Sequence, residues 1–306
     1  MNDYELMSIV LSLRPKAVPS GDDRPAPSWW GRAAHAFFLR LVAASDPAAA
    51  EQLHAESAVR PFTVSNLLGR FADYSSHRSS PGEEGLRGGR HPDPAQIYTL
   101  RLTALTGQLC RLLGEQLQPG GSLAPGSLIE LDYLPFALET TILDPAQHPW
   151  AAASAYQALF NAYLLPTNPP PNKVTLHLAS PTGFHSAGRQ VPLPLPELVF
   201  GSLLERWNSF APLAFPDELR RYIAECLVVT RFDLNSRAVP LKDGGLRFGA
   251  TGDVTYGTLN YDRYWMSLVS TLASFAQFSG VGAGTAMGLG QCRRVEMDRA
   301  GSQATS

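Results

Sequence analysis

Five glycines punctuate a short run near the end of the chain, GVGAGTAMGLG, and they constrain the local fold more than any other feature of the sequence. They are Gly280, Gly282, Gly284, Gly288 and Gly290. A phosphate-binding P-loop requires lysine and then serine or threonine directly after its last glycine, but Leu289 follows Gly288 and Gln291 follows Gly290. A dinucleotide fingerprint requires a third glycine three residues after the second, where this chain has Thr285 or Met287. The spacing excludes both nucleotide-binding loops.

The segment before the glycines is amphipathic. Its apolar residues recur at three-to-four-residue spacing and predict a helix over 262–278: Trp265, Leu268, Val269, Leu272, Phe275 and Ala276. An extended segment follows the glycines, so the run joins a helix to a strand. Two interpretations remain open. Positive φ angles at glycine can align several amides into an anion-binding nest, or they can form a tight turn that lets the helix and the strand pack closely.

Composition indicates a soluble globular chain of 306 residues, with 44% hydrophobic and 17% charged residues. No apolar run approaches the ~18 residues of a membrane span, and the N-terminus lacks the features of a secretory signal, so we expect a cytoplasmic protein. Cys110, Cys226 and Cys292 are widely separated, which predicts no metal site and a reducing compartment. A net charge of -2 argues against an extended nonspecific DNA binder but leaves room for local RNA contacts.

The order of the predicted elements indicates the fold. Strands are expected at 4–13, 61–64, 97–105 and 127–143, and helices at 31–44, 46–54 and 106–117. Asp46 followed by Pro47 predicts the N-cap and first turn of the second helix. A surface insertion is expected between 75 and 94, and a linker at the proline-rich run 166–171. Beyond it come strands at 173–179, 227–234 and 246–256, a loop at 180–196, helices at 197–208, 216–226 and 262–278, and a final strand.

Each half therefore has the order strand, helix, strands, helix, strand. This order predicts an α+β protein of two tandem ferredoxin-like (βαββαβ) domains with antiparallel sheets. We place the N-terminal domain at 1–166 and the C-terminal domain at 172–306.

Three stretches of the chain carry a resemblance to a known family. They are HAFFLRLVAASDPAAAEQLHAESAVRPFTVS, VTLHLASPTGF followed by PLPLPELVFGSLLERWN, and FAQFSGVGAGTAMGLGQCRRV. The chain resembles the repeat-processing CRISPR-associated endoribonucleases, the sixth Cas family of the RAMP superfamily. The resemblance implies cleavage of CRISPR repeat RNA into guide RNAs in a prokaryotic cytoplasm, without metal or cofactor. The 2′-hydroxyl of the RNA would attack and leave a 2′,3′-cyclic phosphate.

That chemistry needs a group that transfers protons near neutral pH, which favours histidine. His35 lies about 100° from Ala34 around the predicted helix, at the edge of its apolar stripe, and the resemblance implies a catalytic histidine in this helix. His54 matches a second family position at the end of the next helix. The alternatives are a packing residue for His35 and a helix C-cap for His54.

Positive charge at the phosphate would come from Arg60 or Arg32, unless these are ordinary solvated arginines. Some family members add a tyrosine and a lysine to the histidine. Here Leu39 stands near the tyrosine position, and no lysine lies near His54. This departure supports a rival hypothesis, a noncatalytic RNA-binding subunit of a CRISPR surveillance complex. A structural or small-molecule-binding protein unrelated to RNA is a third reading.

The RNA-binding residues are expected in the C-terminal half. They are the five loop glycines, His185 and Arg189 in the segment SPTGFHSAGRQ, and Arg293 directly after the loop. His177 is expected to be a packing residue in a strand. The implied partners are repeat RNA and the crRNA product, with subunits of a CRISPR effector complex as further candidates. The chain is expected to be a monomer or a homodimer that binds no membrane.

Overall fold

A computed structural model of the chain describes residues 4–16, 27–55, 59–71, 92–240 and 245–295. Most of the predicted insertion at 75–94 lies outside these residues. Contacts divide the chain into two units. The first unit comprises Met1–Ser154, Pro240–Leu246 and Gly284–Leu289, and the second comprises Ala155–Val239, Arg247–Ala283 and Gly290–Ser306. The glycine run is therefore shared, because its middle belongs to the first unit and its two ends belong to the second.

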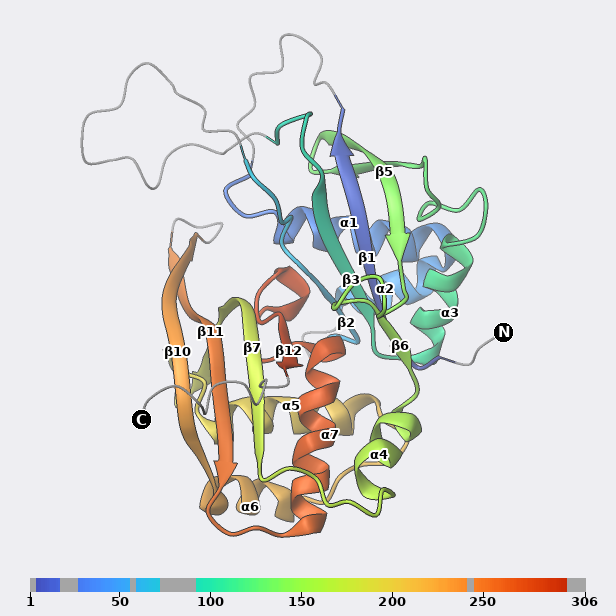
Figure 1. The fold of residues 1–306 in the computed structure, drawn as a ribbon. Helices are drawn as coiled ribbons and strands as arrows, with labels where there is room; N and C mark the ends of the chain where they lie inside the picture. Colours follow the sequence, from blue (N-terminus) through green and yellow to red (C-terminus); the bar gives the residue numbers. More distant parts are fainter. Residues whose placement is uncertain (1–3, 17–26, 56–58, 72–91, 241–244, 296–306) are drawn as a thin grey trace, which may run out of the picture. The chain divides into compact units, whose positions relative to one another are not determined.

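The first unit contains an antiparallel sheet with helices packed on it (Figure 1). Its elements are β1 (Leu6–Pro15), α1 (Gly31–Ser45), α2 (Pro47–Ala55), β2 (Phe62–Val64), β3 (Tyr98–Ala104), α3 (Gly107–Gln116), β4 (Leu128–Leu131), β5 (Leu134–Ile142) and β6 (Ala152–Ser154). The strand order is β2-β3-β1-β5-β4, with β6 pairing β1. This order places β1 centrally between β3 and β5, as a βαββαβ chain requires.

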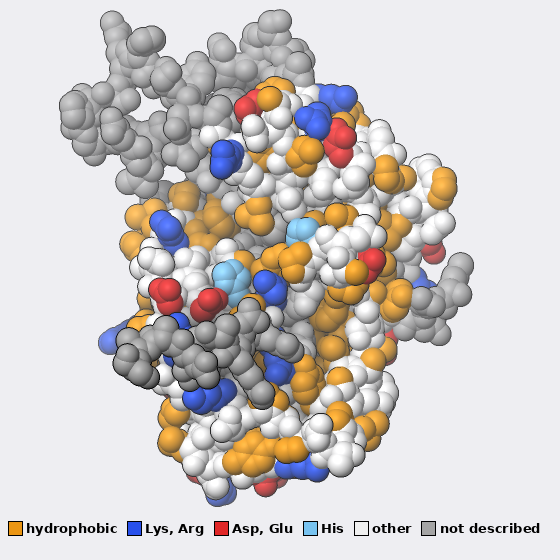
Figure 2. Space-filling view, viewed as in Figure 1, with side chains coloured by type: hydrophobic (Ala, Val, Ile, Leu, Met, Phe, Trp, Pro, Cys, Tyr) orange, Lys and Arg blue, Asp and Glu red, His pale blue; other side chains and the backbone are white. Residues whose placement is uncertain are grey.

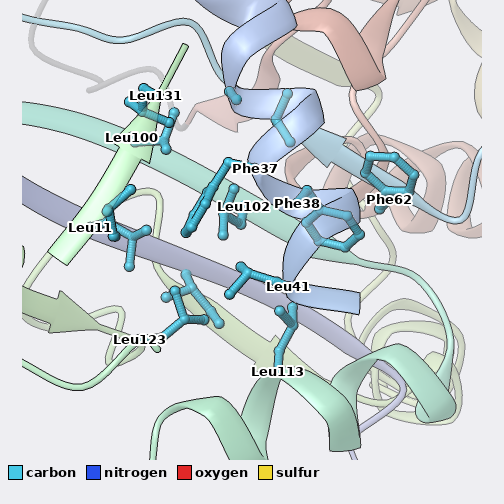
Figure 3. Close-up of a cluster of buried hydrophobic side chains, with 14 of the residues drawn as sticks. Leu11, Phe37, Phe38, Leu41, Phe62, Leu100, Leu102, Leu113, Leu123 and Leu131 are labelled. Atoms are coloured by element: carbon cyan, nitrogen blue, oxygen red, sulfur yellow. The ribbon is translucent and has the colours of Figure 1, made fainter. Parts of the chain in front are cut away.

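The core of the first unit explains why α1 forms where it does. The apolar stripe of α1 puts Phe37, Phe38 and Leu41 against leucines of the sheet (Figure 3). Phe38 stacks on Phe62 of β2 with ring centroids 4.1 Å apart. At the next helix, Asp46 Oδ1 accepts a hydrogen bond from Ala49 N at 3.0 Å, which confirms the predicted N-cap of α2. The stacked rings fix α1 on β2, close to the candidate histidine.

The second unit repeats this plan. Its elements are α4 (Tyr156–Leu164), β7 (Lys173–Thr182), β8 (Phe184–Ser186), β9 (Arg189–Val191), α5 (Pro196–Phe210), α6 (Glu218–Cys226), β10 (Leu227–Pro240), β11 (Leu246–Thr258), α7 (Arg263–Ser279) and β12 (Cys292–Val295). A short 3-10 turn, η1 (Thr285–Met287), lies within the glycine run. The sheet order is β10-β11-β7-β12, and β7 pairs antiparallel with both β11 and β12. The predicted α+β class with antiparallel sheets is confirmed.

The sequence predictions missed helix α4, the short strand β6 and the β8–β9 hairpin. Helix α4 lies between proline-containing segments, and most of its surface is only half-buried, so it shows no clear apolar stripe. The segment expected as a loop at 180–196 contains the β8–β9 hairpin. Its two turn residues, Ala187 and Gly188, have φ of 50° and 74°, the signs of a type I′ turn, but alanine is an unusual residue there and hid the signal.

The division by contacts falls between Ser154 and Ala155, so α4 groups with the second unit. The boundary that we placed between 166 and 172 stays a prediction about folding domains. Among the helices that the structure describes, none is long and apolar enough to cross a membrane.

Candidate active site

His35 lies on α1, half-buried at the edge of the helix's apolar stripe. Its ring centroid is 5.4 Å from that of Phe62, the residue that also stacks on Phe38. Its Nδ1 atom is 2.8 Å from the carbonyl oxygen of Ala286, a residue 251 positions later in the chain. The ring is thus held by an aromatic contact and by the backbone of η1.

The Ala286 contact determines which ring nitrogen carries a proton. A backbone carbonyl oxygen only accepts hydrogen bonds, so Nδ1 must be the donor and must be protonated. In the neutral ring the basic lone pair then lies on Nε2. This is the nitrogen that can take a proton from a substrate hydroxyl.

The middle of the glycine run is built to hold that carbonyl. Trp29 Nε1 donates to Met287 O at 2.7 Å, and Ser65 and Gly288 form a parallel β-bridge. Within the turn, the amides of Met287 and Leu289 both donate to Gly284 O, at 2.8 and 3.2 Å. The segment is fixed on both sides of Ala286.

The N-terminal end of the run is anchored in the second unit by α5. Ser202 Oγ accepts from Gly282 N at 3.0 Å, and one helical turn later Arg206 Nη2 donates to Gly282 O at 2.8 Å. Burial lowers the pKa of Arg206 to about 10. Neither residue was predicted. Their four-residue spacing shows that they share a helix face, but nothing in the sequence shows what that face meets.

All five loop glycines have positive φ: Gly280 60°, Gly282 76°, Gly284 80°, Gly288 86° and Gly290 63°. This conformation is costly for other residues, which explains the glycine spacing. Most of the amides in the run already donate to protein acceptors, including those of Val281, Gly282, Ala283, Met287, Leu289, Gly290 and Gln291. Of the two interpretations, the structure favours a tightly packed turn over an open anion-binding nest.

One predicted arginine lies near Phe62, which contacts His35, and the other lies on the same helix as His35. Arg60 is two residues before Phe62, within about 7 Å of it along even an extended backbone. Its Nη1 atom is buried and has no hydrogen-bond partner among the described residues. Arg32 is exposed and lies one turn before His35 on α1, in the i,i+3 relation of helix neighbours. His54 is in the last turn of α2, and its side chain lies outside the described residues.

The predicted RNA-binding side chains of the second unit lie on the β8–β9 hairpin and on β12. His185 and Arg189 are exposed on the β8–β9 hairpin. Arg293 of β12 pairs in register with His177 of β7, and His177 Nδ1 is 2.6 Å from Asp253 Oδ1 on β11. His177 is therefore a partly exposed residue in hydrogen-bonding contact with Asp253 rather than the packing residue we expected. On the face shown in Figure 2, basic side chains are scattered among acidic and apolar ones.

No group of three or more His, Cys, Asp or Glu side chains that could hold a metal ion occurs within the part of the chain that the structure describes. The fold and the site together define a protein with two ferredoxin-like units whose glycine loop orients a helix-borne histidine.

Two family models match the chain. The model of the CRISPR Cas6 N-terminal domain matches residues 7–81, and that of the CRISPR-associated endoribonuclease Cas6 matches residues 176–292. The two ranges together span well over half of the chain and include His35, Arg60 and the glycine run. The chain belongs to the Cas6 family.

Individual relatives agree with this assignment. A CRISPR-associated endoribonuclease Cas6 of Mycobacterium tuberculosis is 30% identical over 127 residues, which cover 41% of this chain and only 40% of that protein. A product complex of Cas6 (TTHA0078) is 27% identical with a TM-score of 0.68, covering 95% of this chain and 99% of that one. A product complex of Cas6 (TTHB231), from Thermus thermophilus, is 25% identical with a TM-score of 0.72, covering 95% and 100%. Another Cas6 (TTHA0078) structure is of a histidine-to-alanine mutant.

Proposed function

We propose that this chain is an endoribonuclease that cleaves CRISPR repeat RNA into guide RNAs. The observation that carries the proposal is the His35 ring, held by Ala286 in the tautomer whose Nε2 is basic, within the region matched by the family's N-terminal model. Family membership and the likeness to Cas6 substrate-mimic and product complexes support RNA as the substrate.

The reaction follows from this geometry. His35 Nε2 accepts the proton of the 2′-hydroxyl, and the resulting oxyanion attacks the adjacent phosphorus in line with the 5′-oxygen. The bond from phosphorus to the 5′-oxygen breaks, the 5′-oxygen takes up a proton, and a 2′,3′-cyclic phosphate remains. The RNA supplies its own nucleophile, so the proposed reaction needs neither a metal ion nor a cofactor.

Charge on the pentacoordinate phosphate needs a positive partner. Arg60 is the first candidate, because its buried Nη1 lacks an acceptor among the described residues and a phosphate oxygen would supply one. Arg32 is the second, because it neighbours His35 on the exposed side of α1. His54 remains a candidate assisting residue from its position on α2.

RNA contacts outside the reacting phosphate are assigned to the second unit and the glycine run. His185, Arg189 and Arg293 present polar or cationic groups suited to phosphates and bases. The glycines shape the surface rather than grip a phosphate, because most amides of the run are already bonded. We expect the protein to act in a prokaryotic cytoplasm, with effector-complex subunits as further partners.

The direct test is incubation with the cognate repeat RNA in EDTA. A single cut that leaves a 2′,3′-cyclic phosphate is expected, and the end can be identified by its resistance to a phosphomonoesterase until acid opens the cyclic ester. Absence of cleavage with and without added divalent metal would refute the proposal.

One observation favours the rival function, a noncatalytic RNA-binding subunit. Leu39 packs partly buried against the core at the position near which some family members carry a tyrosine. Tight binding of repeat RNA with no turnover, measured on the same preparation, would establish this alternative.

A further inference from the structure

We propose that the segment Gly284–Leu289 is a positioning element for His35, and that the Ala286 carbonyl selects the Nδ1–H tautomer that the reaction requires. The inference rests on the proposed function, since it assigns the role of Nε2 in that reaction. It gives the spacing of the glycine run a task different from phosphate binding.

The contact has the properties of an orienting hydrogen bond. Ala286 is 7% exposed and its neighbour Thr285 is 3% exposed, so water competes little for the carbonyl. The bond between His35 Nδ1 and Ala286 O persists when Nε2 gains a proton, because Nδ1 is a donor in both states. A carbonyl in this position does for His35 what a carboxylate does for the histidine of a hydrolytic triad.

The carbonyl is placed by contacts that leave no room for side chains. A Cβ atom built on Gly31, the first residue of α1, would lie 1.9 Å from Met287 O and 2.6 Å from Trp29 Nε1. A Cβ atom on Gly288 would lie 2.9 Å from Asn66 N, and its φ of 86° is itself unfavourable for other residues. Gly31 and Gly288 thus let the turn approach α1 closely enough for Ala286 to reach His35.

The contacts also fix the direction of approach. Trp29 donates to the carbonyl oxygen of Met287, the residue after Ala286. Two consecutive carbonyls of η1 therefore accept from Trp29, just before α1, and from His35, in the second turn of α1. Trp30 N–H donates to Asn66 Oδ1 at 2.7 Å and ties the same helix start to the chain beside Gly288. Displacing the turn by a fraction of an ångström therefore changes the His35 bond directly.

The test compares Gly31→Ala with Gly114→Ala in the full-length protein. Gly114 is also a helical glycine of the first unit, but nothing lies within 4 Å of a Cβ built there. Alanine improves helix propensity at both positions, so the comparison of the two variants removes this contribution. The tautomer is measured by nitrogen-15 NMR of histidine-labelled protein without RNA, with the His35 signals assigned from a His35→Gln variant.

In the wild type and in Gly114→Ala, His35 should show a protonated Nδ1 and an unprotonated Nε2 at a pH where the ring is neutral. In Gly31→Ala the ring should become a mixture of tautomers, and single-turnover cleavage should slow by about tenfold or more, with RNA affinity changed less than about threefold. Trp29→Phe, which removes only the donor to Met287 O, should change both readouts in the same direction and serves if Gly31→Ala does not fold.

The outcomes separate this inference from the function. Cleavage by a wild type whose His35 is protonated on Nε2 would overturn the positioning role and leave the endonuclease intact. An unchanged tautomer in Gly31→Ala or Trp29→Phe, whatever the rate, would also overturn it. A wild type that never cleaves RNA but shows the Nδ1–H tautomer, lost in Gly31→Ala, would refute the function while the positioning contact stands.

Discussion

Two parts of the glycine run, the one around Gly282 and the turn between Gly284 and Gly288, use the same residue type for different purposes. In the second unit, Gly282 is clamped through both its N–H and its C=O by Ser202 and Arg206 of α5. In the first unit, the turn between Gly284 and Gly288 presents its Ala286 carbonyl to His35. One part is anchored, and the other orients a reactive group. A repeated motif therefore does not imply a repeated function, because each glycine permits only a backbone shape.

The largest effect is expected at His35. His35→Ala should slow cleavage of the cognate repeat by about a thousandfold, within the usual range for a general acid or base. RNA affinity, measured by fluorescence anisotropy, should change little. His177→Ala is the matched control, because that ring bonds a carboxylate on the exposed sheet of the second unit. A larger loss of rate in the control would move the active site away from α1.

The second-largest effect is expected at Arg60, the arginine proposed to neutralise the charge of the reacting phosphate. Arg60→Gln keeps a polar side chain but removes the positive charge, and should slow the single-turnover rate by about a hundredfold. Arg40→Gln is its control, because Arg40 is an exposed arginine of the same unit that donates to the Glu130 carbonyl. Equal rates for both variants would show that the phosphate finds its counter-charge elsewhere.

A smaller effect, on the free energy of unfolding, is expected at Gly288. It separates the cost of a positive φ from the cost of a steric clash between the new Cβ and Asn66. Gly288 and Gly120 both have φ of 86°, so an alanine meets the same intrinsic strain of about 1–2 kcal/mol at each. Only Gly288→Ala also meets Asn66 N at 2.9 Å, whereas nothing lies within 4 Å at Gly120. Gly288→Ala should lose about 1–3 kcal/mol more in free energy of unfolding by urea titration. Equal losses would mean that the turn has room to move.

The smallest effect on stability is expected at Ser202, which anchors Gly282 to α5. Ser202→Ala removes the acceptor of Gly282 N–H and should lower the free energy of unfolding by about 1 kcal/mol relative to Ser209→Ala. Ser209 lies on the same helix and bonds only its own helix, to Glu205 O, so the pair corrects for helix propensity. The chemical step of Ser202→Ala should stay within about twofold of wild type, since this part of the run does not contact His35. A larger loss of rate would show that anchoring Gly282 also affects the orientation of His35.

Much of the fold was predictable from local patterns. Apolar spacing located α1, α3, α5 and α7, and Asp46 followed by Pro47 located the start of α2. These signals are local, because a helix buries one face wherever it packs. Helix α4 was not predicted because it lacks a clear apolar stripe, and the β8–β9 hairpin was not predicted because it turns at an alanine.

The candidate site was predictable only in part. His35 was proposed because a histidine at the edge of this helix's apolar stripe matches the family's pattern, and Arg60 because it closely follows His54 and could supply the positive charge that the reaction needs. Trp29, Ser202 and Arg206 were missed, because each acts through a backbone atom of the glycine run that lies 76 to 258 residues away. Side-chain bonds to distant backbone leave no trace in local composition.

The sequence by itself determined the α+β class, the tandem order of elements, the exclusion of nucleotide-binding loops and the resemblance to the Cas6 family. The first three depend on periodicity and spacing, and the resemblance depends on the residues of three stretches, all of which are written along the chain. Only the tertiary structure decided that the middle of the glycine run packs with the first unit, and that its Ala286 carbonyl fixes the proton on His35. That choice depends on close contacts such as the 2.8 Å approach of His35 Nδ1 to Ala286 O, two residues 251 positions apart, and packing alone brings such residues together.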